Sequence, residues 1–389
     1  MPDSATYDRR AVWSWALYDF ANSAFNTLVI TFVYSTYFTS EIAASDEVGT
    51  TLWGNAAAVS AVLIAVLSPF LGTLADQSGR RKSFLGIATG ATVLATAALF
   101  VPQSGDVYAA LALFVTANTA FELAFVFYNA YLPDLAPADM MGRISGWGWA
   151  LGYALLVAPD EPVLFSTEAG ANVRATNLLV AVWFALFSLP FFAFAPRQER
   201  TAETTTGNPL QSSFRELLET ARQVRRFEEV VRLLAARLFY NDGLLTIFNF
   251  GSIYAANVLG FSFNEIFLFG ITLNVAAGLG AFAFDFVDDR LGGRRTLLIT
   301  VAGLTVGTVL ALAAQTKAML WIAGVVIGVF IGPNQSASRS LLGHFTPPGK
   351  KGEFFGFFAF SGKATAFLGP LLFGWATLWF ETQRAGVAS

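Results

Sequence analysis

The sequence lacks cysteine and contains little charge. None of its 389 residues is Cys, only 13% are charged, and there is one His, His344. Without Cys there are no disulfides and no thiolate metal sites, and one His can build neither a His-ligated metal site nor a catalytic triad. We therefore expect no enzymatic activity, no metal and no cofactor. Nothing in the sequence supports nucleic-acid binding.

Apolar residues, by contrast, are abundant. They make up 55% of the chain and form runs of about 20 residues, the length that crosses a bilayer as a helix. A soluble helical protein would need charged faces at helical spacing, and these are missing. The sequence predicts an all-α, multi-pass membrane protein with eleven spans, at about 12–39, 52–75, 83–101, 107–132, 143–164, 176–196, 236–259, 263–287, 296–314, 317–342 and 354–380.

The basic residues predict the orientation of these spans. All but three of the 24 Lys and Arg residues fall in or beside alternate loops, and the exceptions are Arg174, Lys317 and Arg384. Because Lys and Arg of short loops are retained in the cytoplasm, we expect the N-terminus to be cytoplasmic.

One short loop occurs twice. Gly72–Lys82 reads GTLADQSGRRK, and Asp289–Arg295 reads DRLGGRR; each has Asp, then Gly three residues later, then basic residues at the fifth and sixth positions. Gly142-Arg143 and Gly352-Glu353 form a second, looser pair. Such duplication is typical of secondary transporters, whose substrate site lies near mid-membrane between the repeats. The predicted halves are 1–196 and 236–389.

A polar linker over 197–235 joins these halves. Its second part, Phe214–Leu234, has apolar residues at helical spacing with charges between them. This pattern predicts an amphipathic helix on the inner membrane surface that tethers the two halves.

Ionisable groups inside the hydrocarbon are costly and mark candidate functional sites. Asp19, Asn22 and Asn26 share one face of the first span; they are either a substrate site or an interhelical hydrogen-bond set. Glu122 is the first candidate for proton coupling, unless a fixed partner neutralises it. Lys363 is the candidate partner of Glu122 or of a substrate carboxylate, unless it snorkels to the surface. The remaining substrate or coupling candidates are Tyr128, Asn129, Asn241, Asp242 and Asn334.

The duplicated loop predicts a gate rather than a substrate site. We expect Asp76 to pair with Arg80 or Arg81 and to cap a helix end, which would close the inner side in one state. The other predicted gating residues are Gly72, Gly79, Asp289, Gly292, Arg294, Arg295 and Arg339.

These motifs resemble a known family. The loop GTLADQSGRRK closely matches the signature that follows the second helix of the major facilitator superfamily. WALYDFANSAF at Trp15–Phe25, FELAFVFYNAYLPDLA at Phe121–Ala136 and the stretch Ser338–Gly374 are similar to its vacuole-effluxer branch. The resemblance implies two pseudo-symmetric helical halves, alternating access, and outward movement of a small solute such as an amino acid. We further expect a monomer in a prokaryotic cell membrane, with the proton as the coupling ion because of Glu122.

Two departures leave alternatives open. Members of this superfamily have twelve spans, so the twelfth is expected to be absent here, and Ala158–Pro162 interrupts the fifth span with two prolines and two acids. The chain is then either a trimmed transporter or a divergent, non-transporting, receptor-like relative. A lipid transporter is a further alternative.

Overall fold

The computed structural model describes residues 8–137, 140–152, 170–196, 209–222 and 224–366, together with Leu372, Trp375, Ala376, Trp379 and Phe380. Within these residues every regular element is a helix, and no strand is present. The predicted all-α class is therefore confirmed.

The chain forms two compact units that exchange segments of sequence. Unit 1 comprises Met1–Leu135, Leu155–Arg222 and Pro347–Phe360, and unit 2 comprises Ala136–Ala154, Gln223–Thr346 and Ser361–Ser389. Each unit thus includes a segment from the opposite half of the sequence. The division at 196 and 236 predicted from the repeats did not include this exchange.

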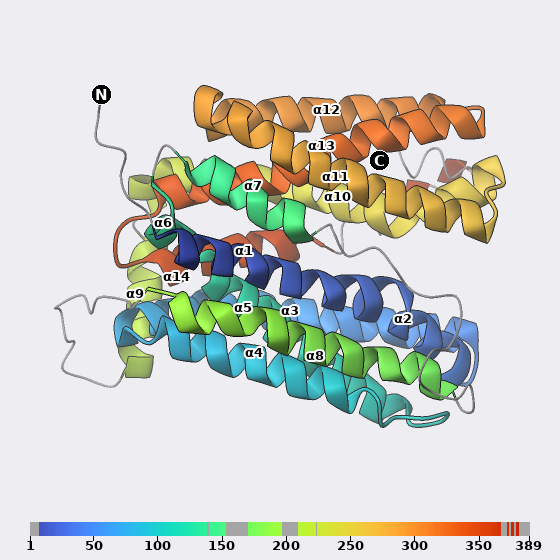
Figure 1. Cartoon of the computed structure of the whole chain (residues 1–389), viewed down its shortest axis with the longest axis horizontal. Coiled ribbons are helices and arrows are strands. Elements are labelled where there is room, and N and C mark those ends of the chain that lie inside the picture. The colour runs from blue at the N-terminus through green and yellow to red at the C-terminus, as the bar shows by residue number, and fades with distance from the viewer. Residues whose placement is uncertain are drawn as a thin grey trace. The chain divides into compact units, whose positions relative to one another are not determined.

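In unit 1, α4 lies against α5 and α8, α1 against α8, and α3 against α5 (Figure 1). Trp15 of α1 stacks on Tyr128 of α5, with ring centroids 4.6 Å apart. Ser45 caps the start of α3 by accepting a hydrogen bond from the Val48 N–H. The helices of unit 1 are α1 (Arg9–Ala24), the π-helical η1 (Phe25–Phe32), α2 (Tyr34–Tyr37), the π-helical η2 (Phe38–Ile42), α3 (Asp46–Ser78), α4 (Arg81–Ala98), α5 (Val107–Asn129), α6 (Leu132–Leu135), α8 (Ala171–Phe194), α9 (Pro209–Arg222) and the first part of α14 (Lys351–Lys363).

In unit 2, α13 packs against α7, α10, α11 and α12 (Figure 1). Phe269 of α11 and Trp321 of α13 contact edge to face, 5.2 Å between centroids. A capping box between Ser262 and Glu265 starts α11. The helices of unit 2 are α7 (Met141–Gly152), the 3-10 turn η4 (Val224–Phe227), α10 (Glu228–Leu259), α11 (Phe263–Leu291), α12 (Gly293–Ala313) and α13 (Lys317–Phe345).

Several helices present apolar side chains outward at helical spacing. On α3 the exposed residues include Val59, Val62 and Val66, and on α8 they include Leu179, Val182 and Leu186. An outward apolar stripe with polar groups buried inside is what a lipid environment requires. By length and composition, six helices of the described part could cross a membrane, over Thr51–Ser78, Val107–Leu135, Ala171–Phe194, Leu268–Leu291, Gly293–Ala313 and Lys317–Phe345.

Two predicted spans extend beyond what the structure describes. The span at 143–164 begins as α7, and its second part, including the Pro-rich interruption, lies outside the described residues. The span at 354–380 begins as α14 and lies outside them over much of 367–378.

The single amphipathic helix predicted over Phe214–Leu234 is two helices. α9 ends at Arg222, and the apolar residues Val230 and Leu234 belong to the first turns of α10. The 3-10 turn η4 separates the two helices, although the apolar residues keep their helical spacing across it.

Close helix contacts in unit 2 predict one sensitive position. A β-carbon on Gly280 of α11 would overlap the carbonyl oxygen of Val329 in α13, whereas one on Gly90 of α4 would meet no atom. We expect Gly280→Ala to lower the free energy of unfolding by about 1–3 kcal/mol because the helices must move apart. The apparent melting temperature in detergent should fall for Gly280→Ala and be unchanged or raised for the control Gly90→Ala. Equal melting temperatures would contradict the close packing.

Candidate functional site

The end of α3 brings a buried carboxylate and a buried guanidinium together. Gly79 ends α3 with φ 62°, a left-handed conformation that glycine adopts without strain, and α4 starts two residues later. The turn places Arg81 Nη2 2.8 Å from Asp76 Oδ1, with both side chains buried. Arg81 therefore provides the basic partner that the sequence assigned to Arg80 or Arg81, and Arg80 is exposed.

Arg81 also reaches the end of α5. Its Nη1 donates to Asp134 Oδ2 at 2.8 Å and to the carbonyl oxygen of Ala130 at 3.1 Å. Asp134 in turn pairs with Lys351, the first residue of α14. A chain of alternating charges therefore runs from α3 through Arg81 and Asp134 to the start of α14.

Asp76 also contacts the start of α14 directly. Its Oδ2 accepts a hydrogen bond from the backbone N–H of Glu353 at 3.0 Å. Glu353 is the third residue of α14, and the first N–H groups of a helix have no acceptor within the helix. A carboxylate at this position satisfies one of them and is also stabilised by the helix dipole. Gly72 allows this approach, because a β-carbon there would overlap the carbonyl of Gly352.

Unit 2 repeats the arrangement with the second copy of the loop. Asp289 Oδ1 accepts a hydrogen bond from the backbone N–H of Arg143 at 3.3 Å, and Arg143 is the third residue of α7. The Gly142-Arg143 and Gly352-Glu353 pairs seen in the sequence are therefore the two helix starts that the duplicated carboxylates cap. In each unit, the capped helix start comes from the opposite half of the sequence.

The two copies differ in the source of the cation. Arg294 and Arg295 are exposed, unlike Arg81. Asp289 pairs instead with the side chain of Arg143, whose Nη2 lies 3.0 Å from Oδ2. Gly292, the counterpart of Gly79, has φ 82°.

Arg339 holds α7 from a second position. It is buried in α13, and its Nε and Nη2 donate to the hydroxyl and carbonyl oxygens of Ser145 at 2.9 Å and 2.5 Å. The Ser145 hydroxyl then donates to the carbonyl oxygen of Ser336 at 3.0 Å. The first turns of α7 are therefore bound at both Asp289 and Arg339.

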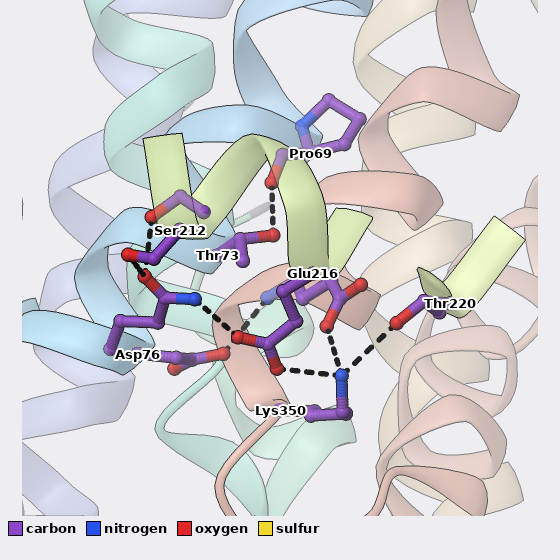
Figure 2. Close-up of polar contacts among 10 residues, drawn as sticks. Pro69, Thr73, Asp76, Ser212, Glu216, Thr220 and Lys350 are labelled. Carbon is purple, nitrogen blue, oxygen red and sulfur yellow. Dashed lines mark hydrogen bonds and ion pairs between the residues drawn. The ribbon is translucent and has the colours of Figure 1, made fainter. Parts of the chain in front are cut away.

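A further group of polar residues joins α9 to the same end of α3 (Figure 2). Glu216 of α9 accepts hydrogen bonds from Gln77 Nε2 at 2.5 Å and from Lys350 Nζ at 2.7 Å. Lys350 Nζ also donates to Thr220 Oγ1 and to Glu353 Oε2, both at 3.0 Å. We call this group the α9 polar cluster; it consists of Gln77, Ser212, Ser213, Glu216, Thr220, Lys350 and Glu353.

The α9 polar cluster is not among the residues predicted from the sequence. The signal that could have predicted it is the polar stripe Ser212, Ser213, Glu216 and Thr220 on one helix face. Lys350 is charged here. Burial lowers the pKa of its ammonium group, but hydrogen bonds and charges from Glu216 and Glu353 outweigh burial and raise the pKa above its usual value.

The candidates in the first span lie beside α5. Tyr18 stacks on Tyr128 at 4.9 Å and Phe25 on Phe121 at 4.6 Å, so the end of α1 and the start of η1 run along 121–128 of α5. Asp19 and Asn22 of α1 are buried, and Asn26 of η1 is exposed. Glu122 is half-buried. Asp19 and Glu122 therefore lie on neighbouring helices of unit 1.

Tyr128 and Asn129 are both buried at the end of α5. The Tyr128 hydroxyl donates to the carbonyl oxygen of Trp15 at 3.0 Å, and the Trp15 indole N–H donates to the carbonyl oxygen of Tyr128 at 3.2 Å. This reciprocal pair holds α1 on α5, which is a packing role for Tyr128.

The remaining candidates lie in unit 2. Asn241 donates to the carbonyl oxygen of Gly362 at 3.1 Å, and Asn334 donates to Thr300 Oγ1 at 3.2 Å. Asp242 and Lys363 are half-buried. Since Glu122 belongs to unit 1 and Lys363 to unit 2, their pairing stays a prediction.

Comparison with known proteins identifies the family. The sequence profile described as "Vacuole effluxer Atg22 like" matches residues 51–146 and 137–386. The chain belongs to this family. The uncharacterized major-facilitator-type transporter YxiO of Bacillus subtilis is 30% identical over 92% of this chain and 86% of its own length. Autophagy-related protein 22 of Kluyveromyces lactis is 27% identical, over 74% of this chain and 65% of its own length.

Solved structures show the same fold. The proton:xylose symporter XylE has a TM-score of 0.73 at 15% identity, over 97% of this chain and 91% of its own. The human organic anion transporter MFSD10 has a TM-score of 0.72 at 14% identity, over 97% and 96%. The family and the major-facilitator-type relative, together with this fold, show that the chain is a multi-pass major facilitator transporter and not an enzyme.

The buried pair predicts a large difference between two adjacent arginines. Replacing Arg81 with Met leaves Asp76 buried without its cation, which should cost about 3–5 kcal/mol. Replacing the exposed Arg80 with Met should change stability by less than about 0.5 kcal/mol. Apparent melting temperatures in detergent measure both; equal values for the two variants would show that the pair does not stabilise unit 1.

Proposed function

We propose that this transporter moves a small solute of the amino-acid class outward across a prokaryotic cell membrane by proton-coupled alternating access. We further propose that it acts as a monomer, since both units belong to one chain, with its N-terminus in the cytoplasm. The vacuole-effluxer family supports outward movement. The solved neighbours share only the fold, so the substrate class rests on the family resemblance and the coupling on the residues.

The observation that best supports alternating access is that each duplicated carboxylate caps a helix from the opposite half of the sequence. Asp76 holds the first turn of α14, and Asp289 holds the first turn of α7, each from the opposite half of the sequence. Alternating access requires contacts between segments of both halves that form in one state and break in another. Polar contacts suit this task, because water can replace each hydrogen bond when the contact opens.

In this proposal the duplicated loops and Arg339 form the gate. Asp76, Arg81 and Asp289 provide the charges, while Gly72, Gly79 and Gly292 allow the turns and the close backbone approach. These gate residues lie near helix ends, away from the middle of the spans, where the solute is proposed to bind.

The coupling proposal rests on two carboxylates inside helices of unit 1. Glu122 is the only acid within α5 and lies fifteen residues after its first residue, about 22 Å along the helix. Asp19 lies on the neighbouring α1. Ionisable side chains inside membrane helices are rare and mark candidate sites for ion coupling. Glu122 is the proposed proton carrier, and Asp19 with Asn22 the proposed solute contact.

Glu122→Gln should abolish the effect of a pH gradient on transport while leaving the protein folded, because the amide cannot release a proton. The assay is uptake of an isotope-labelled amino-acid mixture into proteoliposomes, with and without an imposed pH gradient. Glu41→Gln, at an exposed position in η2, is the matched control and should behave like the parent protein. Gradient-dependent uptake that survives in Glu122→Gln would remove Glu122 as the carrier.

A further inference from the structure

We propose that Glu216 of the linker helix α9 is a gate-positioning residue: together with Lys350 it seats the start of α14 on the end of α3. The contact must be released each time the gate opens. The inference rests on the proposed alternating access, but it concerns a segment outside the duplicated loops.

The helix α9 turns its polar face towards unit 1. Its buried residues are polar, Ser213 and Thr220, while Phe214 and Leu218 are 56% and 41% exposed. An amphipathic helix ordinarily buries its apolar face against the protein. In α9 the polar face is the docked one, so hydrogen bonds rather than apolar burial hold it to unit 1.

Glu216 lies between α3 and the start of α14. Its two carboxylate oxygens bind different segments: Oε2 binds Gln77 of α3, and Oε1 binds Lys350, just before α14. Gln77 is secured in turn, because its Oε1 accepts hydrogen bonds from Ser212 and Ser213 at 2.8 Å and 2.7 Å. Glu216 is therefore the bridge by which α9 connects the two segments (Figure 2).

These contacts and the capping contact of Asp76 hold the same helix start, that of α14. Gln77 follows Asp76 in sequence, and Lys350 precedes Lys351, the partner of Asp134. Lys350 also binds the side chain of Glu353, whose N–H binds Asp76. The α9 polar cluster therefore restrains the same first turn of α14 that Asp76 caps.

Exposure indicates that the bridge can be released. The side chains of Lys350 and Glu216 are 28% and 30% exposed, whereas those of Arg81 and Asp76 are 2% and 4% exposed. A partly exposed ion pair is weaker and more readily hydrated than a buried one. In sequence, α9 is followed by the short turn η4 and by α10.

Because the sequence contains no Cys, a single introduced cysteine can report on the contact between α14 and α3. Ser68 of α3 is fully buried and donates to the carbonyl oxygen of Gly356 in α14 at 3.1 Å, so a cysteine at 68 is covered while α14 is seated. Ser60, buried against Asn118 and Thr119 of α5, provides a control position away from α14. The reaction rate of Ser68→Cys with a water-soluble maleimide, in the full chain in proteoliposomes, reports how often α14 leaves α3.

In the Ser68→Cys background, Glu216→Gln should raise the labelling rate roughly five- to tenfold, the size expected for loss of one hydrogen bond of typical strength. Glu219→Gln, on the same helix and paired only with the exposed Arg215 in the described contacts, should leave the rate unchanged. Ser60→Cys should stay unlabelled with each variant.

The proposal is overturned if Glu216→Gln leaves the Ser68→Cys rate unchanged, or if Glu219→Gln raises it equally. It is also overturned if Ser60→Cys labelling rises in parallel, because Glu216 would then stabilise unit 1 as a whole. The readout needs no transported solute. Its failure can therefore be distinguished from failure of the transport assay.

Discussion

A helix that starts where water is scarce needs acceptors for its first backbone N–H groups, and the structure depends on how this need is met. Two helices, α7 and α14, each start against a carboxylate of the duplicated loop, Asp289 or Asp76. Both carboxylates satisfy an N–H of the third helical residue and gain from the helix dipole. The exchange of segments between the two units follows, because each carboxylate caps a helix from the opposite half of the sequence.

The other polar groups stabilise this arrangement to different degrees. Arg81 compensates Asp76 in a buried pair and extends the contact to Asp134. Arg143 pairs with Asp289 from the capped helix itself, in a more exposed position. Glu216 adds another exposed contact from the linker. The buried Arg81–Asp76 pair keeps the first loop folded, and the more exposed contacts provide the reversible part of a gate.

The sequence was sufficient for the class, the repeats and the capping carboxylate, because apolar run length and a duplicated loop are local signals. It was insufficient to predict which helix each carboxylate contacts. The N–H that Asp76 binds lies 277 residues further along the chain, and no periodicity specifies which helix packs on which. The linker shows the same limit: the apolar spacing around Phe214 predicts an amphipathic helix, but not the tertiary hydrogen bonds that orient its polar face towards unit 1. Tyr128 stays a candidate from the sequence, and its hydrogen bonds with Trp15 depend on a helix contact that the sequence does not specify.

Hydrogen–deuterium exchange of the two capped helix starts tests the central claim most directly. With Asp76→Asn, peptides that contain Glu353 should exchange faster while peptides that contain Arg143 keep the rate of the parent protein. With Asp289→Asn the effect should be reversed. This reciprocal pattern is the result that two independent carboxylate caps predict. Unchanged exchange at both helix starts, or equal acceleration of both by either variant, would contradict the account.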